Sequence, residues 1–179
     1  METSAQATTN DTNLDNIQAF LSNYAENLEK GTAGDFLGFS EQNYYELEAL
    51  AHKFYVQQRY DKARIVLEGL VSLSAFRPYP FLLFGEVLMV EQKLDEARTC
   101  LEKAHELDKK SVGVKLKLAE LYVKLERNDD AAVLLMDILN IEDLQGSDYI
   151  KQQRARVIMH ALAEAHAKTT QQEEAAQRS

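Results

Sequence analysis

Residue types that mark several other protein classes are scarce in this sequence. Its single cysteine, Cys100, cannot form a disulfide within the chain, which therefore suits a reducing compartment. Only two prolines and seven glycines occur in 179 residues, so few positions would break a helix. With 45% hydrophobic and 27% charged residues, this composition favours a mainly helical protein of one domain.

Positive charge and long apolar runs are lacking as well. The net charge of −9 and the pI near 5.0 argue against nucleic acid as a partner, because phosphate binding depends on Lys and Arg. Residues 1–13 carry no basic region followed by an apolar stretch, so we expect no secretion signal. The run "YPFLLFGEVLMV" at residues 79–90 is interrupted by Glu86 and is too short to span a bilayer. We expect a cytoplasmic protein without stable membrane association.

A long phrase recurs in the chain at an interval of 34 residues. "VQQRYDKARIVLEGLVSLS" at residues 56–74 returns as "VEQKLDEARTCLEKAHELD" at residues 90–108, which makes Ala63 and Ala97 equivalent. A third copy places Ala131 a further 34 residues on. A fixed period of 34 with two helices per unit is typical of tetratricopeptide repeats. We predict an all-α solenoid of three repeats, the first with helices over residues 44–57 and 60–73.

The repeats divide the chain into four segments. Residues 1–13 and 169–179 are predicted as disordered tails, residues 14–38 as an N-terminal helix and glycine-containing linker, and residues 39–168 as the repeat domain with a C-terminal capping helix. Ser40 followed by Asn43 predicts a capped helix start. The N-terminal helix has an apolar stripe that no repeat covers, so it either folds back on its own array or packs against a second copy, and of the two we favour a homodimer. The stripe consists of Leu14, Ile17, Phe20, Leu21 and Tyr24.

No arrangement of catalytic or metal-binding residues is visible in the sequence. The four histidines, His52, His105, His160 and His166, are scattered and lack the spacing of a zinc pair. Cys100 stands beside a repeat-signature leucine, which indicates a structural thiol. We therefore expect a protein-binding module that is not an enzyme and that uses no metal and no cofactor.

The inner helices of stacked repeats line a concave surface. Its predicted mixture of Tyr, Leu, Met and Glu suits an extended peptide that carries apolar anchors and a basic residue. The candidate groove residues are Tyr45, Glu48, His52, Tyr55, Tyr79, Leu82, Glu86, Met89 and Glu120. Further positions on this side are Val56, Val90, Leu116, Val123 and Lys124, of which Leu116 and Val123 are expected mainly in the core.

Residues 14–140 resemble a known family. After the N-terminal helix come the linker "LEKGTAGDFLGFS" and the repeats "YYELEALAHKFYVQQRYDKARIVLEGLVSL" and "YPFLLFGEVLMVEQKLDEARTCLEKAHELD". This order is similar to that of the tetratricopeptide chaperones of bacterial type III secretion, virulence-associated proteins that hold translocators before export. The resemblance implies a small bacterial cytoplasmic chaperone, in many cases a dimer. It also implies a translocator segment lying extended along Glu48, His52, Tyr55, Leu82 and Met89.

Two other functions would use the same fold. The chain could serve as a scaffold or assembly factor in a multi-protein envelope machine, with contacts made through the convex face or the N-terminal helix. It could instead be a chaperone for a needle subunit, which would present an amphipathic helix and not an extended segment.

Overall fold

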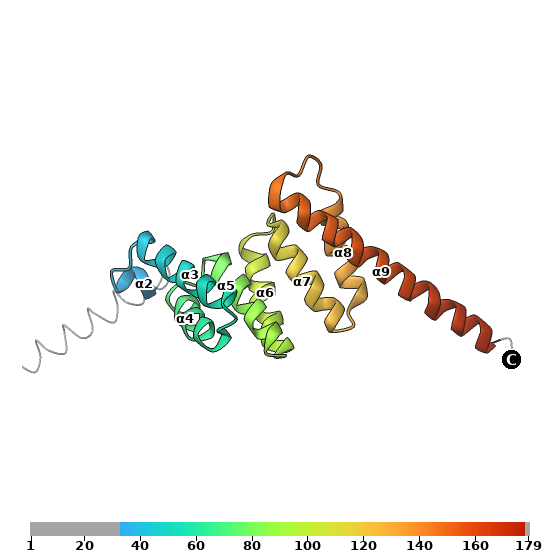
Figure 1. Cartoon of the computed structure of the whole chain (residues 1–179), viewed down its shortest axis with the longest axis horizontal. Coiled ribbons are helices and arrows are strands. Elements are labelled where there is room, and N and C mark those ends of the chain that lie inside the picture. The colour runs from blue at the N-terminus through green and yellow to red at the C-terminus, as the bar shows by residue number, and fades with distance from the viewer. Residues whose placement is uncertain (1–32, 178–179) are drawn as a thin grey trace, which may run out of the picture.

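Helices make up most of the chain that the computed structural model describes, residues 33–177. The short α2 (Ala33–Phe36) precedes three helix pairs: α3 (Glu41–Val56) with α4 (Tyr60–Leu73), α5 (Pro78–Val90) with α6 (Leu94–Leu107), and α7 (Val112–Lys124) with α8 (Asn128–Leu139). Helix α9 (Gly146–Gln177) packs on α7 and α8. The pairs stack in chain order (Figure 1), which confirms the predicted all-α array of three repeats with a C-terminal helix over the last one.

One type of turn joins the two helices of every pair. Its central residues Gln58, Gln92 and Glu126 have left-handed φ angles of 59°, 62° and 59°. The next backbone N–H then donates to a carbonyl oxygen five residues earlier, as Arg59 does to Phe54 at 2.9 Å. This bond satisfies a carbonyl that the ending helix leaves free, as in the Schellman arrangement. The first turn of each second helix carries an acidic residue, which favours the positive end of the helix dipole: Asp61, Asp95 and Asp129.

Small residues allow the two helices of a pair to touch. Ala51 and Ala119 are fully buried on α3 and α7, and Gly85 holds the equivalent place on α5. A Cβ atom added to Gly85 would lie 2.5 Å from Cγ of Leu101 on α6. A side chain at this position would therefore force the two helices of the second pair to shift.

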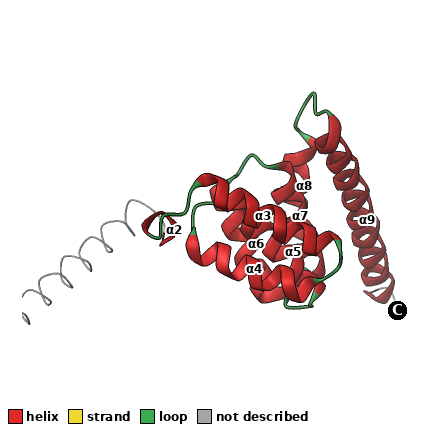
Figure 2. Ribbon diagram, turned by 60° about the vertical axis from the view of Figure 1, so that its left-hand side comes forward, coloured by secondary structure: helices red, strands yellow, loops and turns green. Residues whose placement is uncertain are grey.

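Two apolar clusters form the core of the array. The first lies between the α3–α4 pair and α5 and includes Tyr44, Leu67 and Val87. The second is larger and runs from Leu88 through the third pair to Ala155 on α9. Phe84 packs against both clusters, so the stacked repeats share a continuous interior. Figure 2 shows the paired helices side by side, with α9 along the end of the array.

The segment before the first repeat contains more structure than the predicted linker. Within it, α2 approaches α4, and a Cβ on Gly34 would lie 1.7 Å from the Tyr44 hydroxyl oxygen, so a side chain there would have to displace the buried Tyr44 ring. Ser40 caps α3 together with Asn43, as predicted. The predicted tail over residues 1–13 and the N-terminal helix with its dimerisation stripe, Leu14, Ile17, Phe20, Leu21 and Tyr24, lie outside the described residues.

Helix α9 differs from the prediction at its end. The sequence predicts an end near Lys168 and a disordered tail over residues 169–179, but the helix continues to Gln177. Residues 169–177 contain no Pro or Gly and are rich in Gln, Glu and Ala, which sustain a helix. The first half is anchored by Gln152, whose Nε2 donates to the carbonyl oxygens of Ile138 (3.1 Å) and Ile141 (2.8 Å) at the end of α8. None of the described helices is long and apolar enough to cross a membrane.

Candidate peptide-binding groove

The inner helices α3, α5 and α7 and the start of α9 line three neighbouring cavities, which together we call the groove. The first cavity, of about 330 Å³, lies between α3 and the start of α5. It shares Tyr79 with the third cavity, and the third shares Glu86 and Lys117 with the second. The first cavity is lined by Tyr45, Glu48, Phe76, Arg77, Pro78 and Tyr79.

Arg77 closes the floor of the first cavity. Its Nε atom lies 2.7 Å from Oε1 of Glu48, and its Nη1 atom lies 2.7 Å from Oε2 of Glu41. The guanidinium carbon also stands 4.9 Å above the Tyr44 ring and 5.0 Å from the Tyr45 ring centre. Burial opposes the charged form, but the hydrogen bonds to Glu48 and Glu41 outweigh it and raise the pKa of Arg77. Arg77 therefore joins α3 to α5 as a permanent cation.

The second cavity lies between the carboxyl-terminal halves of α5 and α7 and measures about 360 Å³. Tyr55 reaches into it from α3, and its hydroxyl donates a hydrogen bond of 2.6 Å to Glu86 Oε2. Burial and the neighbouring Glu86 carboxylate raise the pKa of Tyr55, so this hydroxyl remains a donor at neutral pH. The other lining residues are Met89, Val90, Gln92, Lys117, Glu120 and Lys124.

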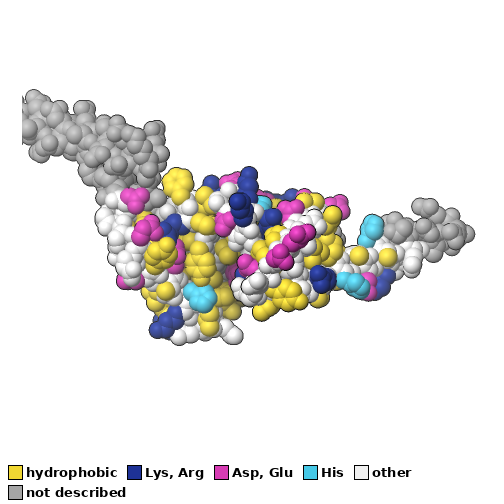
Figure 3. Space-filling view, turned by 90° about the horizontal axis from the view of Figure 1, so that it is seen from above, with side chains coloured by type: hydrophobic (Ala, Val, Ile, Leu, Met, Phe, Trp, Pro, Cys, Tyr) yellow, Lys and Arg dark blue, Asp and Glu magenta, His cyan; other side chains and the backbone are white. Residues whose placement is uncertain are grey.

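The third cavity, of about 470 Å³, is bounded by α5, α7 and the first turns of α9. Leu82, Leu116 and Ile150 supply aliphatic side chains, whereas Lys151 and Arg154 bring positive charge from α9. The remaining lining residues are Tyr79, Glu86, Ser111, Gly113 and Lys117. In the space-filling view, hydrophobic side chains are interspersed with acidic and basic ones and form no single wide apolar face (Figure 3).

A chain of polar contacts runs along the groove and links its four inner helices. From the Tyr55–Glu86 hydrogen bond it continues to Lys117, whose Nζ lies 3.8 Å from Glu86 Oε1 and 3.4 Å from Glu120 Oε2. Glu120 Oε1 then lies 2.6 Å from Nε of Arg154 on α9. Each of these helices contributes at least one member, so the polar contacts follow the same path as the apolar packing that joins the repeats.

The structure brings most of the predicted groove residues to these cavities. Tyr45, Glu48 and Tyr79 line the first, Tyr55, Glu86, Met89 and Glu120 the second, and Leu82 the third. His52 is exposed on α3 and lines none of the three. Each groove glutamate already contacts a cation of this chain, so the glutamates give little reason to expect a basic residue in a bound peptide.

Sequence reasoning missed the cations that hold these glutamates: Arg77, Lys117 and Arg154. Arg77 lies in the loop before α5, whereas the predicted groove residues all lie on inner helices. A signal for Arg154 was present, because it follows Glu120 by 34 residues, the interval of the repeat. Extending the period into the last helix would have placed it on the inner face.

The described residues contain no group of three or more His, Cys, Asp or Glu side chains that could hold a metal ion. Cys100 is half-buried on α6. Burial and the nearby Glu96 raise the pKa of its thiol to about 11, so the unreactive protonated form dominates at neutral pH.

Known proteins share the repeat sequence and the fold of this chain. Residues 88–153 match the family model of the tetratricopeptide repeat. The translocator chaperone SycD of Yersinia enterocolitica is similar in structure, with a TM-score of 0.66 and 19% identity over 73% of this chain and 98% of SycD. The chain has the fold of the type III secretion translocator chaperones.

Two further solved structures share this fold. PcrH, a protein of Pseudomonas aeruginosa solved with the chaperone binding region of PopD, gives a TM-score of 0.66 at 19% identity, over 72% of this chain and 97% of its own. A type III secretion complex from Aeromonas hydrophila gives 0.71 at 16% identity, over 86% and 98%. No curated protein sequence matches this chain significantly.

Proposed function

We propose that this protein is a chaperone of type III secretion that holds an extended segment of a translocator in the groove. The observation that carries the proposal is the row of three connected cavities along the inner helices, lined by Tyr45, Tyr79, Tyr55 and aliphatic side chains. The shared fold with PcrH, which was solved with a chaperone binding region of PopD, supports it.

The chemistry of the groove fits this role. Separate pockets with aromatic and aliphatic lining residues accept the side chains of an extended chain, whose residues alternate in direction, and the surrounding polar groups can bind its backbone. A translocator carries membrane-inserting stretches that aggregate when they are exposed, so covering one segment keeps the client soluble. The protein would act in the bacterial cytoplasm, without catalysis or a cofactor. A homodimer through residues 14–24 remains part of the proposal.

The test is a pull-down from the native host with three forms of the full chain as bait. We expect the wild type to retain one dominant protein with predicted membrane-spanning stretches, and Tyr55→Ala with Tyr79→Ala to lose it. Met89 is left intact, because at 8% exposure it belongs to the core. The matched control is Ile65→Ala with Val133→Ala, which removes side chains 65% and 62% exposed on α4 and α8, outside the groove.

The opposite pattern would favour another function. If all three forms retain several envelope components and no membrane-inserting client, the chain is a scaffold. If the retained protein is a small helical subunit that binds as a helix, the needle-subunit alternative holds. Circular dichroism on each variant separates loss of binding from loss of fold.

A further inference from the structure

The 34-residue period continues into α9, although no fourth repeat is completed. Two rows of inner-face residues extend from α5 through α7 to α9: Leu82, Leu116 and Ile150, and Glu86, Glu120 and Arg154. All six line the second or third cavity. The start of α9 therefore serves as a fourth inner helix of the groove.

The packing of α9 shows where the period stops. Ala51, Gly85 and Ala119 are small because a second helix crosses them, but the next place in this row is Gln153. Without a crossing helix, α9 leaves apolar side chains in the open: Ile150 is 68% exposed, whereas its equivalent Leu116 is 3% exposed. The apolar row thus ends in a side chain available to a partner.

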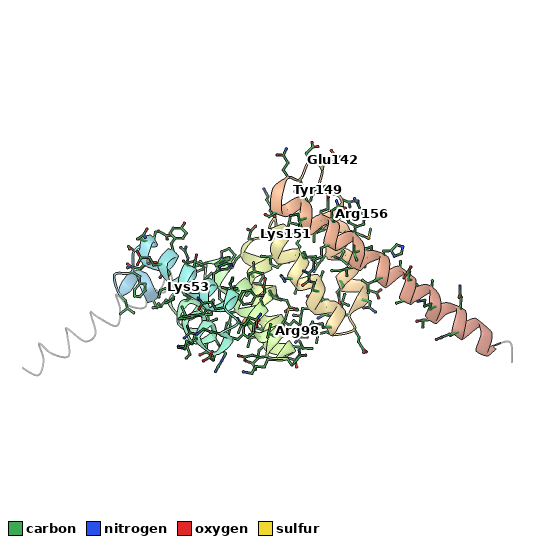
Figure 4. The ribbon with its side chains drawn as sticks, in the orientation of Figure 1. Lys53, Arg98, Glu142, Tyr149, Lys151 and Arg156 are labelled. Carbon is green, nitrogen blue, oxygen red and sulfur yellow. The ribbon has the colours of Figure 1, made fainter. Side chains whose placement is uncertain are left out.

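Charge reverses along the second row. Its first two members, Glu86 and Glu120, are acidic, whereas the equivalent residue on α9 is the cation Arg154. Lys151 lies one turn before Arg154 on α9. Lys151 is seen where α9 begins beside α7, at the other end of the array from Lys53 (Figure 4). The third cavity consequently combines an aliphatic floor with a rim that carries positive charge.

One cation of this rim, Arg154, is far more accessible than the carboxylate that it contacts. The Arg154 side chain is 60% exposed, whereas its partner Glu120 is 12% exposed. Their contact is made through Nε, and a guanidinium offers five N–H donors in all. Lys151 is 36% exposed and contacts only the exposed Asp148 one turn away among the ion pairs of the described residues. A carboxylate approaching Arg154 from solvent would therefore meet N–H donors before it met Glu120.

On these grounds, and resting on the proposed function, we propose that the third cavity takes an aliphatic side chain of the client with an Asp or Glu within two positions of it. Residues two apart in an extended segment point to the same side, about 6–7 Å apart. The aliphatic group would lie on Leu82, Leu116 and Ile150, and the carboxylate would meet Lys151 and Arg154. The net charge of −9 would by itself repel an acidic peptide, so any preference for one must come from this local rim.

The probe is a set of 12-residue peptides selected from a displayed random library on the full chain. The best binder is synthesised in two forms, with its acidic residue and with the corresponding amide, and both are titrated by fluorescence anisotropy. The quantity compared is the ratio of the two dissociation constants. We expect the amide to bind about threefold to fivefold more weakly to the wild type, the range of a partly exposed ion pair.

Three variants test the origin of that ratio. Lys151→Gln with Arg154→Gln should bring it to about one. Lys151→Gln alone should lower it partly, and this variant leaves the Arg154–Glu120 contact intact. The matched control, Lys53→Gln with Lys62→Gln, makes the same charge change at exposed positions on α3 and α4 and should leave the ratio unchanged. Added salt should shrink the wild-type ratio.

Several results would overturn the proposal. The acidic preference is wrong if the selected peptides bind through Tyr55 and Tyr79 but lack acidic residues. It is also wrong if both double variants show the same ratio of dissociation constants as the wild type. Either result leaves the proposed function standing. A selection without any binder would overturn both. If Lys151→Gln with Arg154→Gln changes the molar mass measured by light scattering but leaves the ratio of the two dissociation constants unchanged, the third cavity binds a second copy of the chain.

Discussion

The contact between Gly85 and Leu101 gives the sharpest test of how the second repeat is packed. In Gly85→Ala the new Cβ would lie 2.5 Å from Cγ and 2.8 Å from Cδ2 of Leu101, and 3.4 Å from the carbonyl oxygen of Ala97. Leu101 is fully buried and cannot move into solvent. Helices α5 and α6 must therefore separate slightly to admit one methyl group.

Two opposing effects set the size of the change. Overpacking a filled core contact costs about 1–3 kcal/mol. Replacing glycine by alanine inside a helix gains about 1 kcal/mol. We therefore expect Gly85→Ala to lower the free energy of unfolding by roughly 0–2 kcal/mol. Ala51 and Ala119 coexist with buried Leu67 and Leu135 in the other pairs, which shows that this type of contact can adjust and favours the lower end of the range.

Gly69→Ala supplies the control that isolates the packing cost. Gly69 lies in α4, and a Cβ there meets nothing within 4 Å, so this variant keeps the gain and avoids the clash. Urea unfolding followed by circular dichroism should place Gly85→Ala about 1–3 kcal/mol below Gly69→Ala. Equal stabilisation by the two alanines would refute the close-packing argument.

Other predictions test the turns, the first cavity and the pH response. Gln92→Gly should raise the free energy of unfolding by about 0.5–1 kcal/mol, because Gln92 has φ of 62° and glycine adopts this conformation freely. Thermal unfolding measures this gain in stability, and an unchanged midpoint temperature would contradict the prediction. Arg77→Met should lower the free energy of unfolding by about 1–3 kcal/mol, because it leaves the Glu48 carboxylate buried without its partner. Urea unfolding measures this loss, and adding Glu48→Gln to the same chain should restore part of it. Burial and nearby lysines lower the pKa of His105 in the folded protein, so the unfolded chain binds the proton more tightly. This contribution should make stability fall as the pH drops below the usual histidine pKa, and urea titrations at pH 7 and pH 5 should show a smaller fall for His105→Gln.

The periodicity explains how much of this structure was predictable. Residues that recur every 34 positions must occupy the same place in each pair, so the boundaries of α4 were predicted correctly as Tyr60–Leu73, and the inner faces could be assigned by equivalence. Contacts that differ from repeat to repeat escape this reasoning. Glu48 is equivalent to Leu82 and Leu116, and only the fold shows that Arg77, from the loop before α5, covers it.

The distribution of charge in the groove suggests that affinity and orientation of a bound segment come from different cavities. Glu48, Glu86 and Glu120 each contact a cation of the chain, so the net charge of −9 is not concentrated in unpaired groove glutamates. In the proposed binding mode, apolar contact with the side chains around Tyr55 and Tyr79 would supply most of the affinity, and such contact discriminates weakly among aliphatic residues. An exposed cation pair at one end adds little energy but fixes direction, because a segment bound in reverse would place its carboxylate far from Arg154. The third cavity is therefore the part of the groove best suited to set the orientation and register of a client.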